Sequence, residues 1–311
     1  MDFVAYLHSL PQYIASGITN GCVYAIVAIG FSVIYNSTQV INFAQGEFVM
    51  IGAMVAAVML AKFSLAVAFP IAVLAGCLAG LLVALCVVIP LKKASVVSLI
   101  IMTIGASIML RGLAQLIWGE ANRNVPPFTG VWVRTPGVSD LQLEDRVIHL
   151  FGAAIGVQQA WVVVMTILLV FAVHVFFKYT LTGQAMRACS MNAAGARLLG
   201  ISVRKMIVMS FVMAAGLGAI AGVTVSPAYC ARCGMGTEIG LKGFCATVLG
   251  GLGSVGGGVV AGIVLGIVER MVEGLPGDFF SAYGGAIAYV ILVGMLILKP
   301  EGLISSAKRR A

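Results

Sequence analysis

Long apolar runs, separated by short polar or basic segments, occupy most of the chain. Several runs reach the length of about 20 residues that an α-helix needs to cross a hydrocarbon core about 30 Å thick, and the alternating pattern of an outer-membrane barrel is absent. The sequence therefore predicts an all-α membrane protein, a polytopic transmembrane helical bundle of about 8–9 spans that includes broken helices. We expect the spans at residues 14–35, 46–61, 64–90, 95–117, 160–177, 206–228, 241–268 and 280–298.

Composition agrees with this pattern. Hydrophobic residues make up 61% of the 311 residues and charged residues 10%, whereas roughly a quarter of the residues in a soluble domain are charged. A net charge of +8 would favour nucleic-acid binding in a soluble protein, but here the basic residues flank apolar runs. We therefore expect residues 1–311 to form a single transmembrane domain surrounded by lipid, with no nucleic-acid partner.

Basic residues predict the orientation of the spans. Lys and Arg cluster at Lys92 and Lys93, in the segment 178–205 and in the tail from Lys299, whereas 118–159 holds three basic and four acidic residues. By the positive-inside rule, the first three regions are cytoplasmic and 118–159 is external. The N-terminus is then external, and an even number of crossings must follow the segment 178–205.

A glycine-rich segment can explain how an even number of membrane crossings follows the segment 178–205. The sequence GGLGSVGGG at 250–258 interrupts an apolar stretch, 239–274, that is too long for one untilted helix and short for two. Broken helices at membrane depth occur where they are buried in protein or line a cavity. Close packing of helices through small residues is an equal alternative, and the number of crossings stays open. The candidate pathway residues here are Gly250, Gly251, Gly253 and Ser254.

A second polar segment follows the first span. Asn42, Gln45 and Glu47 lie within six residues between two apolar runs. Such side chains can bond unwound backbone or neighbouring helices. We weigh two interpretations equally, plain turn chemistry at the cytoplasmic surface and a gate or substrate contact.

Signatures of enzymes and of ion coupling are weak. The chain has no phosphate-cradling G-x-x-x-x-G-K-[ST] loop, no H-E-x-x-H pair and no G-x-S-x-G turn, so we predict a non-enzymatic subunit without cofactor or metal. The ionisable residues near span ends are explained by snorkelling or helix capping, with ion coupling the minor alternative; they are Glu47, Arg111, Glu269 and Arg270.

A disulfide or metal half-site at Cys230 and Cys233 is a minor alternative that stays open.

The segment 178–205 has a pattern that membrane anchoring does not require. It carries five basic residues and no acidic one. Asn192 is a good N-cap and Gly200 a good residue beyond the C-terminus, so Ala193 to Leu199 can form a helix of two turns. So short a helix is marginal alone and would be stabilised by docking to a partner protein. The alternative is a basic loop against anionic lipid.

At these residues the chain resembles a permease subunit of the branched-chain amino-acid ABC importer family, specifically its H-type subunit. The matching pieces run in the family's order: Gly21-x-x-Tyr24-Ala25, Ala28-x-Gly30, INFAQGEF at 41–48 with Gly52-Ala53, G-x-A-M-R-A at 183–188, Asn192, ARLLGI at 196–201, GLKGF at 240–244, VLGGLGSVGGG at 248–258, Gly262, Gly266, Glu269 and KPEGL at 299–303. Gln45 stands where many members have His, so a role tied to an imidazole there does not transfer.

The resemblance implies a heterodimeric permease core with a second homologous subunit, two cytoplasmic ATP-binding subunits and a periplasmic binding protein that delivers Leu, Ile or Val, all at a bacterial inner membrane. It also implies that 178–205 is the coupling loop that seats on the ATPase. The candidate coupling residues are Gly183, Arg187, Ala188, Asn192, Ala196, Arg197, Gly200 and Ile201. Two rival functions stay open, a urea or short-amide permease of the same family and a stand-alone secondary carrier or channel.

Overall fold

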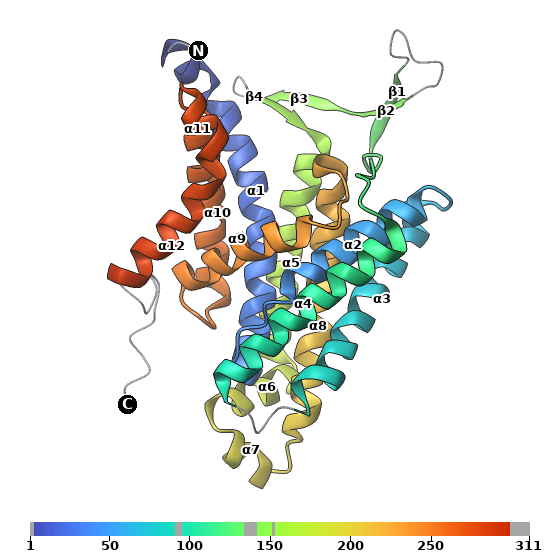
Figure 1. Cartoon of the computed structure of the whole chain (residues 1–311), viewed down its shortest axis with the longest axis vertical. Helices are drawn as coiled ribbons and strands as arrows, with labels where there is room; N and C mark the ends of the chain where they lie inside the picture. The colour runs from blue at the N-terminus through green and yellow to red at the C-terminus, as the bar shows by residue number, and fades with distance from the viewer. Residues whose placement is uncertain (1–2, 91–94, 134–141, 151–152, 299–311) are drawn as a thin grey trace.

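A computed structural model describes residues 3–90, 95–133, 142–150 and 153–298, and it forms a helical bundle (Figure 1). The helices are α1 (Phe3–Thr38), α2 (Gln45–Leu60), α3 (Leu65–Val83) with the π-helical turn η1 (Ala84–Val88), α4 (Val96–Trp118), α5 (Val157–Tyr179), α6 (Leu181–Met191), α7 (Ala193–Leu198), α8 (Val203–Tyr229), α9 (Met235–Gly250), α10 (Val255–Glu273), α11 (Asp278–Tyr283), the 3-10 turn η2 (Gly284–Ala286) and α12 (Ile287–Leu298).

Two β-hairpins lie at one end of the bundle, and α6 and α7 lie at the other (Figure 1). β1 (Gly130–Val133) pairs antiparallel with β2 (Gln142–Asp145), and β3 (Val147–Leu150) pairs antiparallel with β4 (Ala153–Gly156). The hairpins fall within 118–159, the region that the charge pattern predicts to be external. The basic clusters at Lys92 and Lys93 and after Lys299 lie outside the described residues.

Within the part of the chain that the structure describes, six helices are long and apolar enough to cross a membrane, and two shorter apolar helices accompany them. The long ones are His8–Thr38, Leu65–Val88, Val96–Trp118, Val157–Tyr179, Val203–Tyr229 and Val255–Glu273, and the shorter ones are Gln45–Leu60 and Gly284–Leu298. These helices follow the predicted apolar runs in order. The prediction of an all-α polytopic bundle is therefore confirmed.

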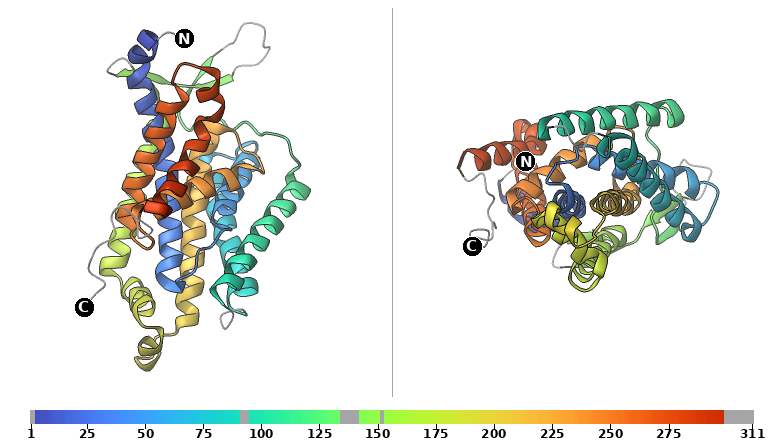
Figure 2. Two further views of the ribbon diagram at one scale, coloured as in Figure 1. Left: turned by 60° about the vertical axis from the view of Figure 1, so that its left-hand side comes forward. Right: turned by 90° about the horizontal axis from the view of Figure 1, so that it is seen from below.

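Helices α1 and α8 form the centre of the bundle, as the view along its length shows (Figure 2). Many of their buried side chains belong to the largest apolar core, together with some from α2, α3 and α5. By contrast, α4 buries few side chains and exposes a row of large apolar ones, such as Leu116 and Ile117. That face suits lipid or another membrane subunit.

Glycine permits the closest contacts between helices. A Cβ atom added to Gly21 of α1 would lie 2.5 Å from Cα of Ile263 and 2.8 Å from the carbonyl oxygen of Gly262, both on α10. Likewise, a Cβ on Gly52 of α2 would lie 2.5 Å from Cα of Ala219 on α8. In lipid, where apolar side chains gain little by leaving one tail-like environment for another, such close backbone packing is a main source of helix association.

The glycine-rich segment 250–258 breaks the last long apolar run, as the sequence predicts. Gly251 and Gly253 adopt φ values of 91° and 85°, which favour glycine, and Oγ of Ser254 accepts a hydrogen bond from the backbone of Gly257 at 3.1 Å. Helix α9 thus ends and α10 begins with its own cap. With 16 residues, α9 extends about 24 Å, less than the full hydrocarbon thickness.

Replacing Gly21 by Leu forces a side chain into the backbone of α10. We expect the free energy of unfolding to fall by about 1–3 kcal/mol or more, because neither backbone can move away without losing its own packing. The control is Gly105→Leu on α4, where a Cβ meets open space. Heating the detergent-solubilised protein and measuring the fraction that stays monodisperse checks this; equal behaviour of the two variants would contradict it.

Candidate functional site

The expected two-turn helix between the basic residues exists as α7. Oδ1 of Asn192 accepts a hydrogen bond from the backbone N–H of Gly195 at 2.9 Å, which caps the N-terminus. Beyond the other end, Gly200 has a φ of 81°, and the N–H of Ile201 donates to the carbonyl of Ala196 at 3.0 Å. Both capping predictions are confirmed.

The α6–α7 segment, residues 181–201, presents apolar side chains at the end of the bundle. Leu198 is 90% exposed and Leu199 is 80% exposed, whereas Ala196 is buried. Gly183 lies against the end of α5, where an added Cβ would be 2.8 Å from Cα of Phe177. The exposed Arg187 donates through Nη1 to the carbonyl of Phe177 at 3.4 Å, so α6 is held on α5 while the tip of α7 is free to contact another surface. Of the other coupling candidates, Ala188 lies on α6 beside Arg187, and Arg197 lies on the exposed side of α7.

The polar residues between α1 and α2 are buried. Asn42 is 1% exposed and Gln45 is 0% exposed. Nε2 of Gln45 donates to the carbonyl of Ala214 on α8 at 3.0 Å, and the amide lies so close to Gly30 of α1 that a Cβ there would be 2.8 Å from the amide carbon. Within the described residues, Oε1 of Gln45 and Nδ2 of Asn42 have no partner. Buried amides with free atoms are unusual and favour contact with a polar solute or water.

Glu47 is 1% exposed, so snorkelling does not explain it, whereas its place in the first turn of α2 is consistent with the alternative of a role at the helix end. Its Oε1 accepts from Oγ of Ser107 on α4 at 2.8 Å and from Oγ1 of Thr237 on α9 at 3.2 Å. Nη1 of Arg111 donates to the same threonine hydroxyl at 2.9 Å, which links the cation indirectly to the carboxylate. Three helices therefore meet at this carboxyl group.

The break between α9 and α10 contacts the end of α1. Nδ2 of Asn36 donates to the carbonyl of Gly253 at 2.9 Å. Across the break, the backbones of Gly250 and Gly257 lie in direct contact, with no room for a side chain. The break is thus a packed, bonded turn at the end of α1.

Two cavities bring the pathway and coupling candidates together. A cavity of about 720 Å³ is lined by Asn42 from the α1–α2 connection and by Arg197 and Ile201 from the α7 region. A second cavity, of about 670 Å³, is lined by Gly253 at the α9–α10 break and by Arg187 of α6. One pathway candidate from each group, Asn42 or Gly253, thus lines one of these two cavities, and each cavity also has a wall from the α6–α7 segment.

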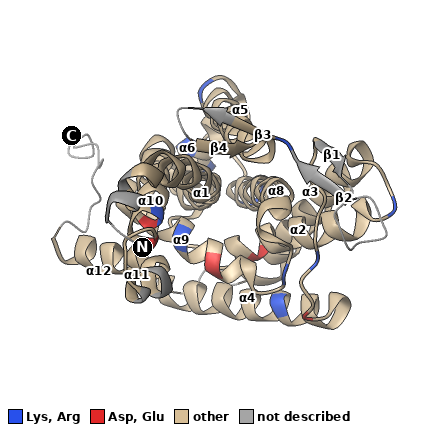
Figure 3. Ribbon diagram, turned by 90° about the horizontal axis from the view of Figure 1, so that it is seen from above, with Lys and Arg blue, Asp and Glu red and all other residues tan. Residues whose placement is uncertain are grey.

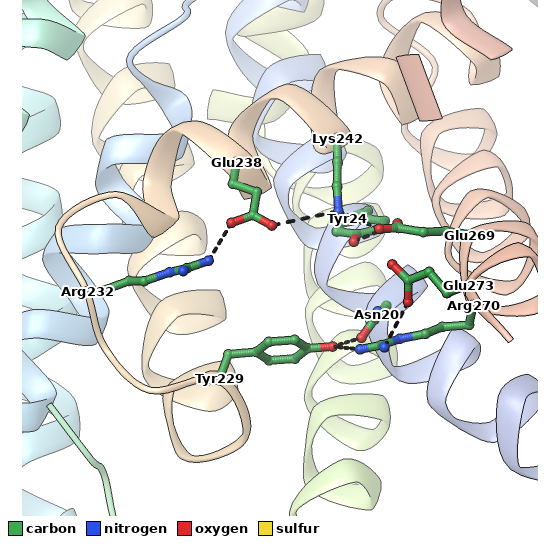
Figure 4. A network of polar contacts seen from close by, with 9 residues as sticks. All are labelled: Asn20, Tyr24, Tyr229, Arg232, Glu238, Lys242, Glu269, Arg270 and Glu273. Atoms are coloured by element: carbon green, nitrogen blue, oxygen red, sulfur yellow. Dashed lines mark hydrogen bonds and ion pairs between the residues drawn. The ribbon is translucent and has the colours of Figure 1, made fainter. Parts of the chain in front are cut away.

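A network of charged side chains lies where α9 and α10 meet α1, the area in which charges gather inside the bundle (Figure 3). Lys242 of α9 forms an ion pair with Glu269 of α10, and both side chains are almost completely buried. The hydroxyl of Tyr24 on α1 donates to Oε2 of Glu269 at 2.9 Å. Oε1 of Glu238 lies 3.9 Å from Nζ of Lys242, and Oε2 of the same carboxylate pairs with Arg232 at 2.5 Å (Figure 4).

A second branch of this network starts one residue further along α10. Arg270 pairs through Nη1 with Oε2 of Glu273 at 2.9 Å, and its Nη2 donates to the hydroxyl of Tyr229 at 2.9 Å. That hydroxyl is also hydrogen-bonded to Asn20 of α1 (Figure 4). The whole network therefore joins α1, α8, α9 and α10 through polar contacts.

Sequence reasoning missed most of this network. Snorkelling does not explain Glu269, which is 1% exposed and has two partners. Lys242 is the second residue of the expected span 241–268, and a lysine within a predicted span is itself a signal of function. Tyr24 and Lys242 occur in the segments that match the family, but the sequence alone does not indicate that they contact each other or Glu269.

The cysteine pair left open by the sequence is not bonded. Among the described residues every cysteine is a free thiol. Sγ of Cys230 donates to Oδ1 of Asn124 at 3.1 Å, and Sγ of Cys233 donates to the carbonyl of Gly119 at 3.2 Å. Both thiols thus connect the segment between α8 and α9 to the region that follows α4.

The sequence is similar to known transport proteins along almost its whole length. A family model described as "Branched-chain amino acid transport system / permease component" matches residues 13–298. The chain is 30% identical over 312 residues to the high-affinity branched-chain amino acid transport system permease protein LivH of Escherichia coli strain K12, with 96% of each chain covered. It is 31% identical over 306 residues to the corresponding protein BraD of Pseudomonas aeruginosa, with 94% of this chain and 95% of that one covered. Among solved structures, PsaBC from Streptococcus pneumoniae in complex with Fab is similar with a TM-score of 0.49 and 10% identity, covering 98% of both chains.

Replacing Lys242 by Met leaves Glu269 buried without its counter-ion. We expect the free energy of unfolding to fall by about 3–5 kcal/mol, because a lone buried carboxylate retains its desolvation cost. The double variant Lys242→Met/Glu269→Gln removes both charges and should recover most of the loss. Unfolding midpoints of the three proteins in detergent measure this, and an unchanged midpoint for Lys242→Met would show that the pair does not contribute to stability.

Proposed function

The chain belongs to the permease family of branched-chain amino acid transport systems, and on that premise we propose that it forms part of the membrane path of an ATP-driven importer for branched-chain amino acids. It is a multi-pass protein of the bacterial inner membrane. The observation that carries the proposal is the match of almost the whole chain, residues 13–298, to the family model. The relatives with 30% or more identity are named for this substrate class.

The proposed assembly contains a homologous second permease subunit, two cytoplasmic ATP-binding subunits and a periplasmic amino-acid-binding protein. The permease itself contributes no ATPase motif, so hydrolysis takes place on the partners. The large exposed apolar face of α4, with Leu116 85% exposed, supports a neighbour in the membrane or a lipid contact. The exposed apolar side chains of Leu198 and Leu199 at the tip of α7 support the proposal that a cytoplasmic subunit binds there.

The two cavities supply a physical route for coupling. ATP binding would bring the ATP-binding subunits together and shift the α6–α7 segment that rests on them. Arg197 and Ile201 line the same cavity as Asn42, and Arg187 lines the same cavity as Gly253. A shift of the segment would therefore change the shape of both cavities, at the α1–α2 connection and at the α9–α10 break.

Transport by the complete importer in proteoliposomes tests the function. We expect L-leucine to accumulate only when the second permease subunit, the ATP-binding subunits, ATP and the loaded binding protein are all present. The control is the same assembly supplied with urea or acetamide, which should not accumulate. Leucine uptake by this chain alone would indicate a stand-alone carrier, and accumulation of urea would indicate the short-amide function.

Replacing Leu198 and Leu199 together by Asp tests the docking surface. We expect co-purification of the ATP-binding subunits to fall at least about tenfold, since two charges would be brought into an apolar contact without partners. The matched control is Leu198→Met/Leu199→Met, which keeps the apolar surface. Normal assembly and normal stimulated ATP hydrolysis of the Asp variant would place the docking surface elsewhere.

A further inference from the structure

A small cavity lies beside the charged network. Its volume is about 120 Å³, and residues of α1, α8, the α8–α9 connection, α9 and α10 line it. Ion-paired side chains form part of its wall, namely Arg232, Glu238, Arg270 and Glu273, and apolar side chains such as Val225 and Ile239 form another part. Opposite charges and apolar side chains therefore line one cavity. Figure 4 shows how its charged side chains lie.

The charges around this cavity balance. Each of its basic side chains, Arg232, Lys242 and Arg270, has a carboxylate partner in Glu238, Glu269 or Glu273. A ligand with a single charge would pair with one member of an ion pair and leave the other member without a partner. A ligand that carries one positive and one negative charge preserves the balance.

We propose that this cavity is a binding station for the zwitterionic head of an α-amino acid, which inserts into the ion pair between Arg232 and Glu238. The α-carboxylate takes the place of the Glu238 carboxylate on Arg232, and the α-ammonium takes the place of the Arg232 guanidinium on Glu238. The apolar side chain of the amino acid then lies against Val225 and Ile239. This inference rests on the proposed function and names where its substrate is recognised within the permease.

The exposure of the ion pairs indicates which one opens. The side chains of Arg232 and Glu238 are 49% and 50% exposed, whereas those of Lys242 and Glu269 are 9% and 2% exposed. Exposed ion pairs contribute little net stability, so a ligand can separate the first pair at small cost. The second pair remains closed, because its separation would leave two charges buried without partners.

The positions of Arg232 and Glu238 in the chain also allow a ligand to replace their ion pair. Arg232 lies in the short connection between α8 and α9, and Glu238 lies in the first turn of α9. The buried pair of Lys242 and Glu269 fixes α9 to α10 behind them, so a ligand can enter without disturbing that contact. An uncharged short amide cannot replace either member of an ion pair, and the station therefore favours amino acids over urea.

The test measures the maximal rate of L-leucine uptake by the complete importer in proteoliposomes, at saturating loaded binding protein and per assembled complex. Under these conditions the affinity of the binding protein does not limit the rate. We expect Arg232→Gln and Glu238→Gln each to lower the maximal rate at least about tenfold, as loss of a charged hydrogen-bond partner does. The matched controls are Arg146→Gln and Glu120→Gln, exposed residues that do not line this cavity.

The exchanged double variant, Arg232→Glu/Glu238→Arg, separates recognition from a structural role. It restores an ion pair and the charge balance, but it reverses the positions of the charges relative to Val225 and Ile239. We expect its uptake rate to stay at least about tenfold below that of the wild type. Recovery to about the wild-type rate would show that the pair acts only as a structural contact and would overturn the inference.

The remaining outcomes are equally decisive. Wild-type rates in both single Gln variants would overturn the inference while leaving the proposed function intact. Absence of ATP-dependent leucine uptake by the wild-type importer would instead overturn the proposed function. Glu238→Gln keeps the size and shape of a half-exposed side chain, so its result stands even where the double variant does not assemble.

Discussion

The close approach of helix backbones at glycine residues is the constraint on which the rest of the structure depends. On α1, Gly17 and Gly21 lie directly on the backbone of α10, and on α2, Gly46 lies on Gly236 and Gly240 of α9. Side chains at these points would separate the helices. The hydrogen bonds and ion pairs between the same helices would then be lost, because they require donor and acceptor atoms within about 3.5 Å of each other.

Two polar clusters owe their geometry to these contacts. The approach of α1 to α10 brings Tyr24 to 2.9 Å from Glu269, and the approach of α2 to α9 brings Glu47 to 3.2 Å from Thr237. Each cluster places a carboxylate in a buried position, where hydrogen-bond donors reach both oxygens of Glu269 and Oε1 of Glu47. The burial of these charged groups therefore depends on the close packing of glycine residues, because that packing brings the hydrogen-bonding side chains together.

The arrangement also separates stable parts of the molecule from parts that can move. The buried pair of Lys242 and Glu269 ties α9 to α10, whereas the half-exposed pair of Arg232 and Glu238 adds little to stability. At one end of the bundle, α7 exposes Leu198. Proposed recognition of the substrate and proposed docking of the ATP-binding subunits thus use less constrained parts of the molecule.

The sequence by itself determined the membrane bundle, the order of its apolar helices, the break at 250–258 and the capped helix α7, because these depend on local hydrophobic length and on residues such as Asn192 and Gly200. The tertiary structure alone decided the burial of Glu47, the network around Glu269 and the assignment of Asn42 and Gly253 to different cavities. The physical reason is distance along the chain. Tyr24 and Glu269 are 245 residues apart, and their contact depends on how whole helices pack rather than on any local pattern.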